Sequence, residues 1–253
     1  EIWRIIGVFN VYNNDTKKNE KLVKIIRNES LGNYSWDSSD SSINDGCGIN
    51  EWSQADLMTE LNTDYIDTTK TSGTTTWYDG NKNQKTGSYD YSKNIKSGYV
   101  NKIANVRWNL GGGSTYGVSA KNIYISERGT THVSNPSDGV TRTNTWNGKI
   151  ALMYPSDYGY ASTNTTCRKE LDTTDSSSNG YCKKNNWLFN SSYQWTLSPL
   201  SSNAINVFHV FSGGPVGINV AYRANGVRPV LFLKSDILIA GGEGTQTNPY
   251  NIG

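Results

Sequence analysis

Charge imbalance and long apolar runs are both missing from this sequence. Its 24 Lys and Arg residues nearly cancel its 22 Asp and Glu residues, leaving a formal charge of +2 over 253 residues. This balance excludes a protein that binds nucleic acid through a basic field. No run approaches the roughly 18 consecutive apolar residues of a membrane helix, so we expect no membrane insertion within this chain. Residues 1–7 also lack the pattern of a signal peptide, which favours a mature or trimmed form whose upstream targeting segment has been removed.

Histidine is scarce, which limits the catalytic chemistry available. The two histidines are His132, in a polar loop, and His209, in an expected strand. A hydrolytic triad needs a nucleophile, a base and an orienting group, and neither histidine stands in a motif that supplies them. No His-x-x-x-His, Cys-x-x-Cys or two-His-one-carboxylate spacing occurs either. We therefore expect no catalytic residue, no metal site and no enzyme activity.

Calcium is the one cofactor for which the sequence offers candidate ligands. Two acidic loops, residues 37–40 and 172–175, alternate carboxylates with hydroxyl-bearing residues, and oxygen ligands suit a hard cation. Neither loop follows the twelve-residue calcium-binding pattern, so no motif supports a calcium site. A solvated polar loop is the favoured interpretation, and we expect no cofactor.

Cysteine is limited to three residues, an odd number. Cys167 and Cys182 flank a polar stretch that reads as a surface loop, and we expect them to form a disulfide; the alternative is two unpaired thiols. A disulfide fits an extracellular or cell-surface location. Cys47 is then left without a partner in the chain, and either is free or once paired with a residue upstream of Glu1.

Small polar residues are what the sequence has in excess: 30 Asn and 25 Gly stand beside many Ser and Thr, and only 18% of residues are charged. This composition is unlike that of a helical bundle. With 35% hydrophobic and 11% aromatic residues, the chain can still bury a core. We expect a single α+β domain spanning residues 1–253.

Local patterns predict a few helices and many short strands. Residues 2–12 and 21–27 read as a β-hairpin around an Asn-rich turn. A helix is expected over 52–61, where Ser53 and Asp56 resemble a capping box, and a second over 91–108, ending at three glycines. Short β-branched or aromatic runs bounded by turn residues predict strands at 122–126, 148–154, 194–198, 206–211, 216–221 and 227–233.

A set of motifs spread over the chain carries a family resemblance. They are Gln-Trp-Thr-Leu-Ser-Pro at 194–199, Gly-Val-Arg-Pro-Val-Leu-Phe-Leu-Lys at 226–234 and Gly-Thr-Gln-Thr-Asn-Pro-Tyr at 244–250, together with segments 3–7, 52–62 and 151–160. In order and number they resemble an uncharacterised family of surface proteins from gut Firmicutes and related bacteria.

Members of that family look like variants of the C-type-lectin fold, related in architecture to formylglycine-generating enzymes and to the variable proteins of diversity-generating retroelements. The resemblance implies two early helices and a small sheet in which the strand of Trp195 and the strand at 227–233 form the core. The segment between those strands would be presented outward. The calcium-and-sugar signatures of true C-type lectins and the catalytic cysteine pair of the formylglycine enzymes are both missing, which disfavours those two activities.

The presented segment has the residue types of a recognition surface. Residues 216–221 alternate in the period of a half-buried strand, and His209 and Phe211 are expected to be exposed on the preceding strand. Flat rings supply contact area and small polar groups adapt to a ligand. The alternative is that the rings at 211 and 222 cover the core. The candidate ligand-binding residues are His209, Phe211, Ser212, Asn219, Tyr222 and Arg223.

The sequence therefore favours a secreted or surface-displayed binding domain, of adhesin or receptor type, that binds a protein or glycan ligand at a cell or host surface through this hairpin. The residue types there are also those that adenine-directed mutagenesis of asparagine codons produces, which is compatible with a retroelement variable protein. One alternative is a structural subunit or tip of a surface filament. Another is a carbohydrate-active enzyme with paired carboxylates, because Asp and Glu are the only abundant catalytic groups.

Overall fold

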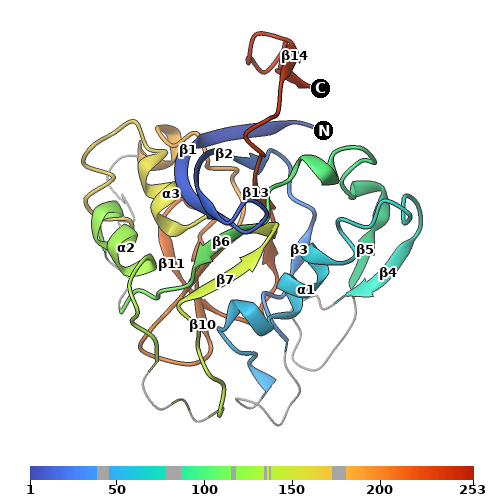
Figure 1. Cartoon of the computed structure of the whole chain (residues 1–253). Coiled ribbons are helices and arrows are strands. Elements are labelled where there is room, and N and C mark those ends of the chain that lie inside the picture. Colours follow the sequence, from blue (N-terminus) through green and yellow to red (C-terminus); the bar gives the residue numbers. More distant parts are fainter. Residues whose placement is uncertain (39–45, 78–86, 115–117, 134–135, 137, 173–180) are drawn as a thin grey trace.

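The computed structural model describes residues 1–38, 46–77, 87–114, 118–133, 136, 138–172 and 181–253. The fold is α+β, with two main antiparallel-rich sheets and a few short helices (Figure 1). The strands are β1 (Trp3–Asn13), β2 (Lys18–Arg27), β3 (Asn33–Tyr34), β4 (Thr74–Trp77), β5 (Gly87–Asp90), β6 (Val106–Asn109), β7 (Thr145–Gly148), β8 (Ile150–Ala151), β9 (Gln194–Pro199), β10 (Asn206–Val210), β11 (Val216–Val220), β12 (Asn225–Gly226), β13 (Val230–Phe232), β14 (Ile239–Gly241) and β15 (Asn251–Ile252). The helices are α1 (Asp56–Asn62), α2 (Ala120–Glu127), α3 (Pro155–Tyr160) and α4 (Tyr181–Lys184), with 3₁₀ turns η2 (Trp52–Gln54), η3 (Tyr91–Lys93) and η4 (Val100–Lys102).

The larger sheet has the strand order β7-β6-β1-β2-β13-β8. Its centre is the long N-terminal hairpin, in which β1 and β2 pair in antiparallel register from Trp3↔Arg27 to Asn13↔Lys18. This confirms the predicted hairpin, although both strands extend further into the Asn-rich turn than the sequence indicated. The C-terminal strand β13 returns to pair with β2, so the two ends of the domain meet in one sheet.

The second sheet has the order β11-β10-β9-β12-β3 and contains the C-terminal hairpin. Strands β9, β10 and β11 confirm the strands predicted at 194–198, 206–211 and 216–221. The family resemblance implied that the strand of Trp195 and the strand at 227–233 share a sheet core, and this is wrong. Within that region β12 pairs with β9 in the second sheet, while β13 belongs to the larger sheet.

The first predicted helix exists but begins later than its sequence pattern indicated. Residues 52–54 form the 3₁₀ turn η2, and α1 starts at Asp56. The expected Ser53–Asp56 capping box is wrong, because Ala55 is the N-cap residue of α1 and Ser53 instead hydrogen-bonds the side chain of Glu51. Leu57 and Leu61 are fully buried, as the predicted apolar face required.

The helix predicted over 91–108 is wrong. Two 3₁₀ turns occupy its first part, and its last part is β6, which pairs with both β1 and β7. Ile103 and Val106 are buried, but on extended backbone. The glycines at 111–113 do not end a helix. They let the chain pass close to other backbone: a Cβ at Gly111 would lie 2.3 Å from the carbonyl oxygen of Ser126.

The strand predicted at 122–126 is also wrong, since these residues lie within α2. Ser119 caps the helix by accepting a hydrogen bond from the amide of Asn122 at 3.1 Å. The buried positions Ala120, Ile123 and Glu127 recur at helical spacing, so one helical face packs inward while Tyr124 and Ile125 remain exposed. The run of apolar residues 123–125 is therefore divided between the buried and the exposed face of a helix.

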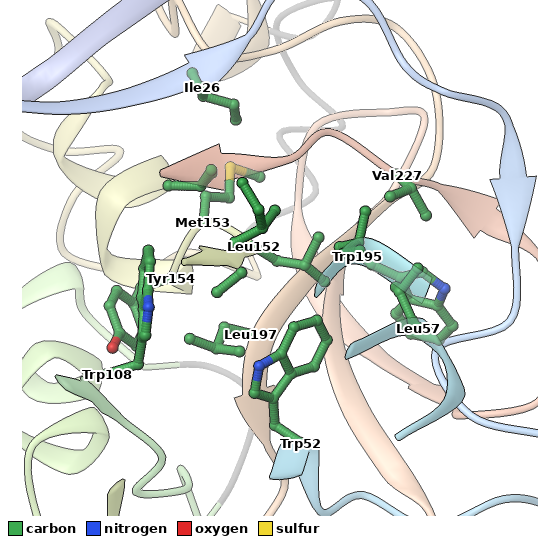
Figure 2. Close-up of a cluster of buried hydrophobic side chains, with 14 of the residues drawn as sticks. Ile26, Trp52, Leu57, Trp108, Leu152, Met153, Tyr154, Trp195, Leu197 and Val227 are labelled. Carbon is green, nitrogen blue, oxygen red and sulfur yellow. The ribbon is translucent and has the colours of Figure 1, made fainter. Parts of the chain in front are cut away.

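A single contiguous cluster of buried side chains lies between the elements, and much of it is aromatic. Figure 2 shows Trp108 beside Tyr154 at one side of the cluster and Trp195 beside Leu57 and Val227 at the other. Trp36 and Trp52 pack with ring centroids 5.2 Å apart. Each ring pair of this kind contributes about 0.5–1.5 kcal/mol to stability, in addition to the contribution of the apolar area that it buries. This core therefore holds the sheets in fixed relative positions.

The last residues form a small hairpin of β14 and β15 that stands away from the body beside the N-terminus (Figure 1). Its Leu238 and Ile239 are exposed. In the part of the chain that the structure describes, no helix combines the length and apolar character that a bilayer span requires.

Candidate functional site

The hairpin of β10 and β11 is firmly built into the second sheet. Its strands pair from Asn206↔Val220 to Val210↔Val216, and β10 pairs on its other side with β9. The turn closes with the amide of Phe211 donating to the carbonyl of Pro215 at 2.8 Å. The predicted site residues therefore lie on a rigid scaffold, which favours a preformed contact surface over a mobile loop.

His209 is not exposed, contrary to the sequence-based prediction, because only 1% of its surface is accessible. In β10 His209 points to the face opposite that of Phe208. That face, however, is covered by aromatic rings from other positions. Tyr193 lies nearly parallel to the imidazole, with ring centroids 5.8 Å apart and planes at 21°, and Phe211 lies 4.4 Å from it.

We define the aromatic cluster as Tyr193, Trp195, His209 and Phe211. Its two outer members are exposed, Tyr193 to 45% and Phe211 to 37%, and their rings meet edge to face at 5.8 Å. Trp195 is fully buried behind them, 5.9 Å from the imidazole. Exposure of Phe211 agrees with the prediction. The sequence analysis did not predict Tyr193 as a site residue. Its position two residues before Trp195 places both side chains on the same side of the chain.

A glycine on the neighbouring strand makes room for the Phe211 ring. A Cβ at Gly217 would lie 2.2 Å from Cε2 of Phe211. Gly217 is the register partner of His209, so the ring of Phe211 extends across β11 at the level of the imidazole. Any larger residue at position 217 would push the ring out of this place.

The imidazole of His209 is held neutral. Burial lowers its pKa to about 4. Nδ1 lies 3.2 Å from the side-chain nitrogen Nδ2 of Asn225. Because Nδ2 can only donate, Nδ1 accepts this hydrogen bond and the ring proton is on Nε2. Nε2 is buried and has no hydrogen-bond partner in the described part of the chain. An unpaired buried donor costs roughly 1–3 kcal/mol, which makes this imidazole a sensitive point beneath the exposed rings.

The turn that carries Phe211 and the exposed Ser212 rests on a disulfide-braced segment. Cys167 and Cys182 are bonded, with Cα atoms 5.6 Å apart, as predicted. Cys182 lies in α4, whose Lys183 contacts Gly214 of the turn. On the other side of the bond, the carbonyl of Leu171 accepts the amide of Val216 at 2.7 Å. Both halves of the braced segment thus touch the hairpin.

The remaining predicted site residues lie toward the other end of the hairpin. Asn219 is half-buried in β11, and its side-chain oxygen accepts the amide of Val220. Tyr222 follows β11, and the guanidinium of Arg223 lies 4.9 Å from its ring centroid. The amide of Tyr222 donates to the carbonyl of Cys47, whose thiol is unbonded. Phe211 lies at the turn, and Tyr222 lies beyond β11 with ten residues between them, so the structure does not gather the predicted set into one compact site.

The buried ionisable groups form a separate, closed network. Lys24 pairs with Asp157 and is surrounded by aromatic rings, the closest being Tyr154 at 4.4 Å from Nζ. Burial lowers the pKa of Lys24, and burial raises the pKa of Glu127 to about 7. Glu127 accepts the amide of Ser156 at 2.9 Å. These groups link α2, α3 and β2, and their burial gives them a structural role.

The acidic loops considered for calcium are only partly described. Asp37 uses its carboxylate on backbone, accepting the amides of Ile49 at 2.8 Å and Asp56 at 3.1 Å. Asp40 and residues 173–175 lie outside the described residues. Among the residues described, no group of three or more His, Cys, Asp or Glu could hold a metal ion.

No family model, curated protein or solved structure matches this chain.

Proposed function

We propose that this chain is a secreted or surface-displayed binding domain whose contact surface is centred on the aromatic cluster. The observation that carries the proposal is the pair of exposed rings, Tyr193 and Phe211, fixed edge to face above a buried His209 and Trp195. Large apolar side chains that are exposed on a rigid sheet and rimmed by polar residues mark interaction sites more often than they mark plain surface. Both rings lose little conformational freedom on binding, because they are already packed against one another.

The surroundings of the rings support a ligand recognised by shape and hydrogen bonds. The neighbouring positions 190–192 and 212–214 supply Asn, Ser and Gly, and Lys183 of α4 lies beside Gly214 of the turn. Electrostatic steering would need a charged field that this nearly neutral chain lacks. A protein or glycan surface with few charges is the ligand class that fits.

The C-type-lectin-like architecture is part of the same proposal. It rests on the order of the sequence motifs, on the long N-terminal hairpin joined by the C-terminal strand β13, and on a second sheet whose hairpin carries the exposed rings. The disulfide is consistent with an extracellular location, since such bonds persist where the environment is oxidising.

Binding of the labelled protein to a printed glycan array and to a panel of bacterial and mammalian cells tests the proposal. Tyr193→Ala and Phe211→Ala are expected to reduce binding at least tenfold each, in the range of interface hot spots. The matched control is Tyr250→Ala, because Tyr250 is also 45% exposed but lies in the C-terminal hairpin.

All three variants should keep the wild-type melting temperature within a few degrees, since each removes a partly exposed side chain. Binding that survives both cluster substitutions, or that is lost equally in the control, would contradict the assignment of the site.

A further inference from the structure

A second exposed group of rings lies on α2 and α3, away from the hairpin turn. Tyr124 is 38% exposed, Ile125 59% and Tyr160 47%. The two tyrosine rings meet edge to face, with centroids 6.4 Å apart. Arg128, the C-cap residue of α2, lies against the Tyr124 ring. We call Tyr124, Ile125, Arg128 and Tyr160 the helical patch.

The guanidinium of Arg128 is fixed in position by three contacts. Its central carbon lies 3.5 Å from the ring centroid of Tyr124, so the two groups are stacked. Its Nη1 donates to the carbonyl of Tyr124 at 3.1 Å and to the carboxylate of Glu127 at 3.0 Å. A guanidinium held in this way has already lost the rotamer freedom that a ligand would otherwise have to remove.

The other edge of the same guanidinium is free. Within the described part of the chain, Nε and Nη2 of Arg128 make no hydrogen bond, and neither is among the buried atoms that lack a partner. Neither nitrogen is fully buried, and the Arg128 side chain as a whole is 26% exposed. Two parallel N–H groups on one edge of an arginine match the two oxygens of a carboxylate, which makes this edge a ready bidentate anion contact.

The charge beside Arg128 does not occupy that edge. Glu127 is buried and shares its oxygens with the amide and hydroxyl of Ser156 as well as with Nη1. The nearby pair of Lys24 and Asp157 is internally balanced. Burial raises the pKa of Glu127 to about 7, and protonation of this carboxyl removes a negative charge from beside the patch.

We propose that the helical patch binds an acidic sugar, a pyranose that carries a carboxylate. The carboxylate accepts from Nε and Nη2 of Arg128, and the C–H face of the ring packs on Tyr160. Ile125 offers apolar contact to a methyl-bearing substituent. This surface is formed by elements other than those of the aromatic cluster, so it stands independently of the function proposed above.

A sugar fits this surface better than a peptide. Extended peptides gain affinity from backbone hydrogen bonds to a free sheet edge, and helical peptides need an apolar groove. The helical patch offers neither, because the backbone of α2 and α3 is bonded within the helices and the exposed groups are rings, one aliphatic side chain and a guanidinium edge. Flat rings next to a bidentate cation suit a small, rigid, acidic ring.

Saturation-transfer NMR and calorimetric titration with 3′-sialyllactose and glucuronic acid test the proposal, with lactose as the neutral comparison. We expect both acids to bind and lactose to bind at least tenfold more weakly. Tyr160→Ala should weaken binding of the acids at least fivefold, and Arg128→Gln at least tenfold. Arg128→Lys should recover little of the affinity for the acids, because an ammonium group cannot form the bidentate contact.

Tyr160→Ala is the decisive variant, because Arg128→Gln also removes a partner of buried Glu127 and could disturb the fold. Tyr193→Ala serves as the control and should leave acid binding unchanged. Equal binding of lactose, or full affinity in Tyr160→Ala, would overturn the proposal. So would equally tight binding of a hexaglutamate peptide with the same dependence on Tyr160, since the ligand class would then be an acidic peptide.

Discussion

His209 and Glu127 are buried groups whose pKa values are displaced in opposite directions, and we predict that their effects on stability nearly cancel between pH 7.5 and pH 4. Burial lowers the pKa of His209 from 6.5 to about 4 and raises that of Glu127 from 4.5 to about 7. In this range the unfolded chain binds more protons than the folded chain at His209, so stability falls as the pH falls. At Glu127 the folded chain binds more protons, so stability rises as the pH falls.

The magnitudes follow from the same pKa values. Each pKa unit corresponds to about 1.4 kcal/mol, so each group alone would change the free energy of unfolding by about 3 kcal/mol across the range. Single substitutions separate the two. In His209→Gln only the Glu127 effect remains, and the variant should gain about 3 kcal/mol in stability, relative to the wild-type profile, on going from about pH 7.5 to about pH 4. In Glu127→Gln only the His209 effect remains, and the variant should lose about as much.

Urea unfolding followed by tryptophan fluorescence at several pH values measures these profiles. The variants are compared by the slope of the free energy of unfolding against pH. A loss of packing energy that is the same at every pH does not change this slope. If His209→Gln and Glu127→Gln both kept the wild-type slope, burial would not be controlling either group and the reasoning would be refuted.

Further predictions concern the support of the two regions. Gly217→Ala should displace the Phe211 ring and reduce ligand binding about tenfold, while the sheet stays folded. A crystal structure or the NMR shifts of the ring can show the displacement. A ring that keeps its place would contradict the packing argument. The disulfide closes a loop of about 15 residues, and its reduction should lower the free energy of unfolding by about 3 kcal/mol. Reduction should also speed hydrogen exchange at the amide of Phe211. Unchanged exchange at this amide would show that the disulfide does not stabilise the hairpin turn. Asp157→Asn should destabilise by about 3–5 kcal/mol because it leaves the Lys24 ammonium buried without its counter-charge, whereas Asp157→Leu combined with Lys24→Met should recover most of that loss in urea unfolding.

The elements predicted well from sequence are those in which a period of two coincides with clear turn residues. The N-terminal hairpin and strands β9 to β11 satisfy this condition, and their bounds differ from the predicted ones by a few residues at most. The failures occurred where the apolar spacing fits two periods. Residues 122–126 are a short β-branched and aromatic run, but the cap at Ser119 and the burial of Ile123 belong to a helix. Val106 stood at helical spacing, yet pairing with β1 and β7 made its segment a strand.

The candidate site was predictable only in part for a related reason. Exposure of Phe211 follows from its place at the end of a strand. The burial of His209 depends on Tyr193, which lies sixteen residues earlier in the chain and packs on the same face. A local sequence pattern cannot predict a contact between residues so far apart in the chain. The helical patch was missed altogether, because the sequence pattern placed Tyr124 in a strand.

The position of β13 also governs when this protein can fold. Ile25 and Leu231 are register partners, so the middle of the larger sheet joins residues that are separated by almost the whole chain. During synthesis β2 must wait with its inner edge unpaired until β13 has left the ribosome, and contacts of such long sequence separation form slowly. The larger sheet should therefore form only after residues 230–232 have been synthesised. Any truncation that removes residues 230–232 should leave a long apolar hairpin open to edge-to-edge aggregation.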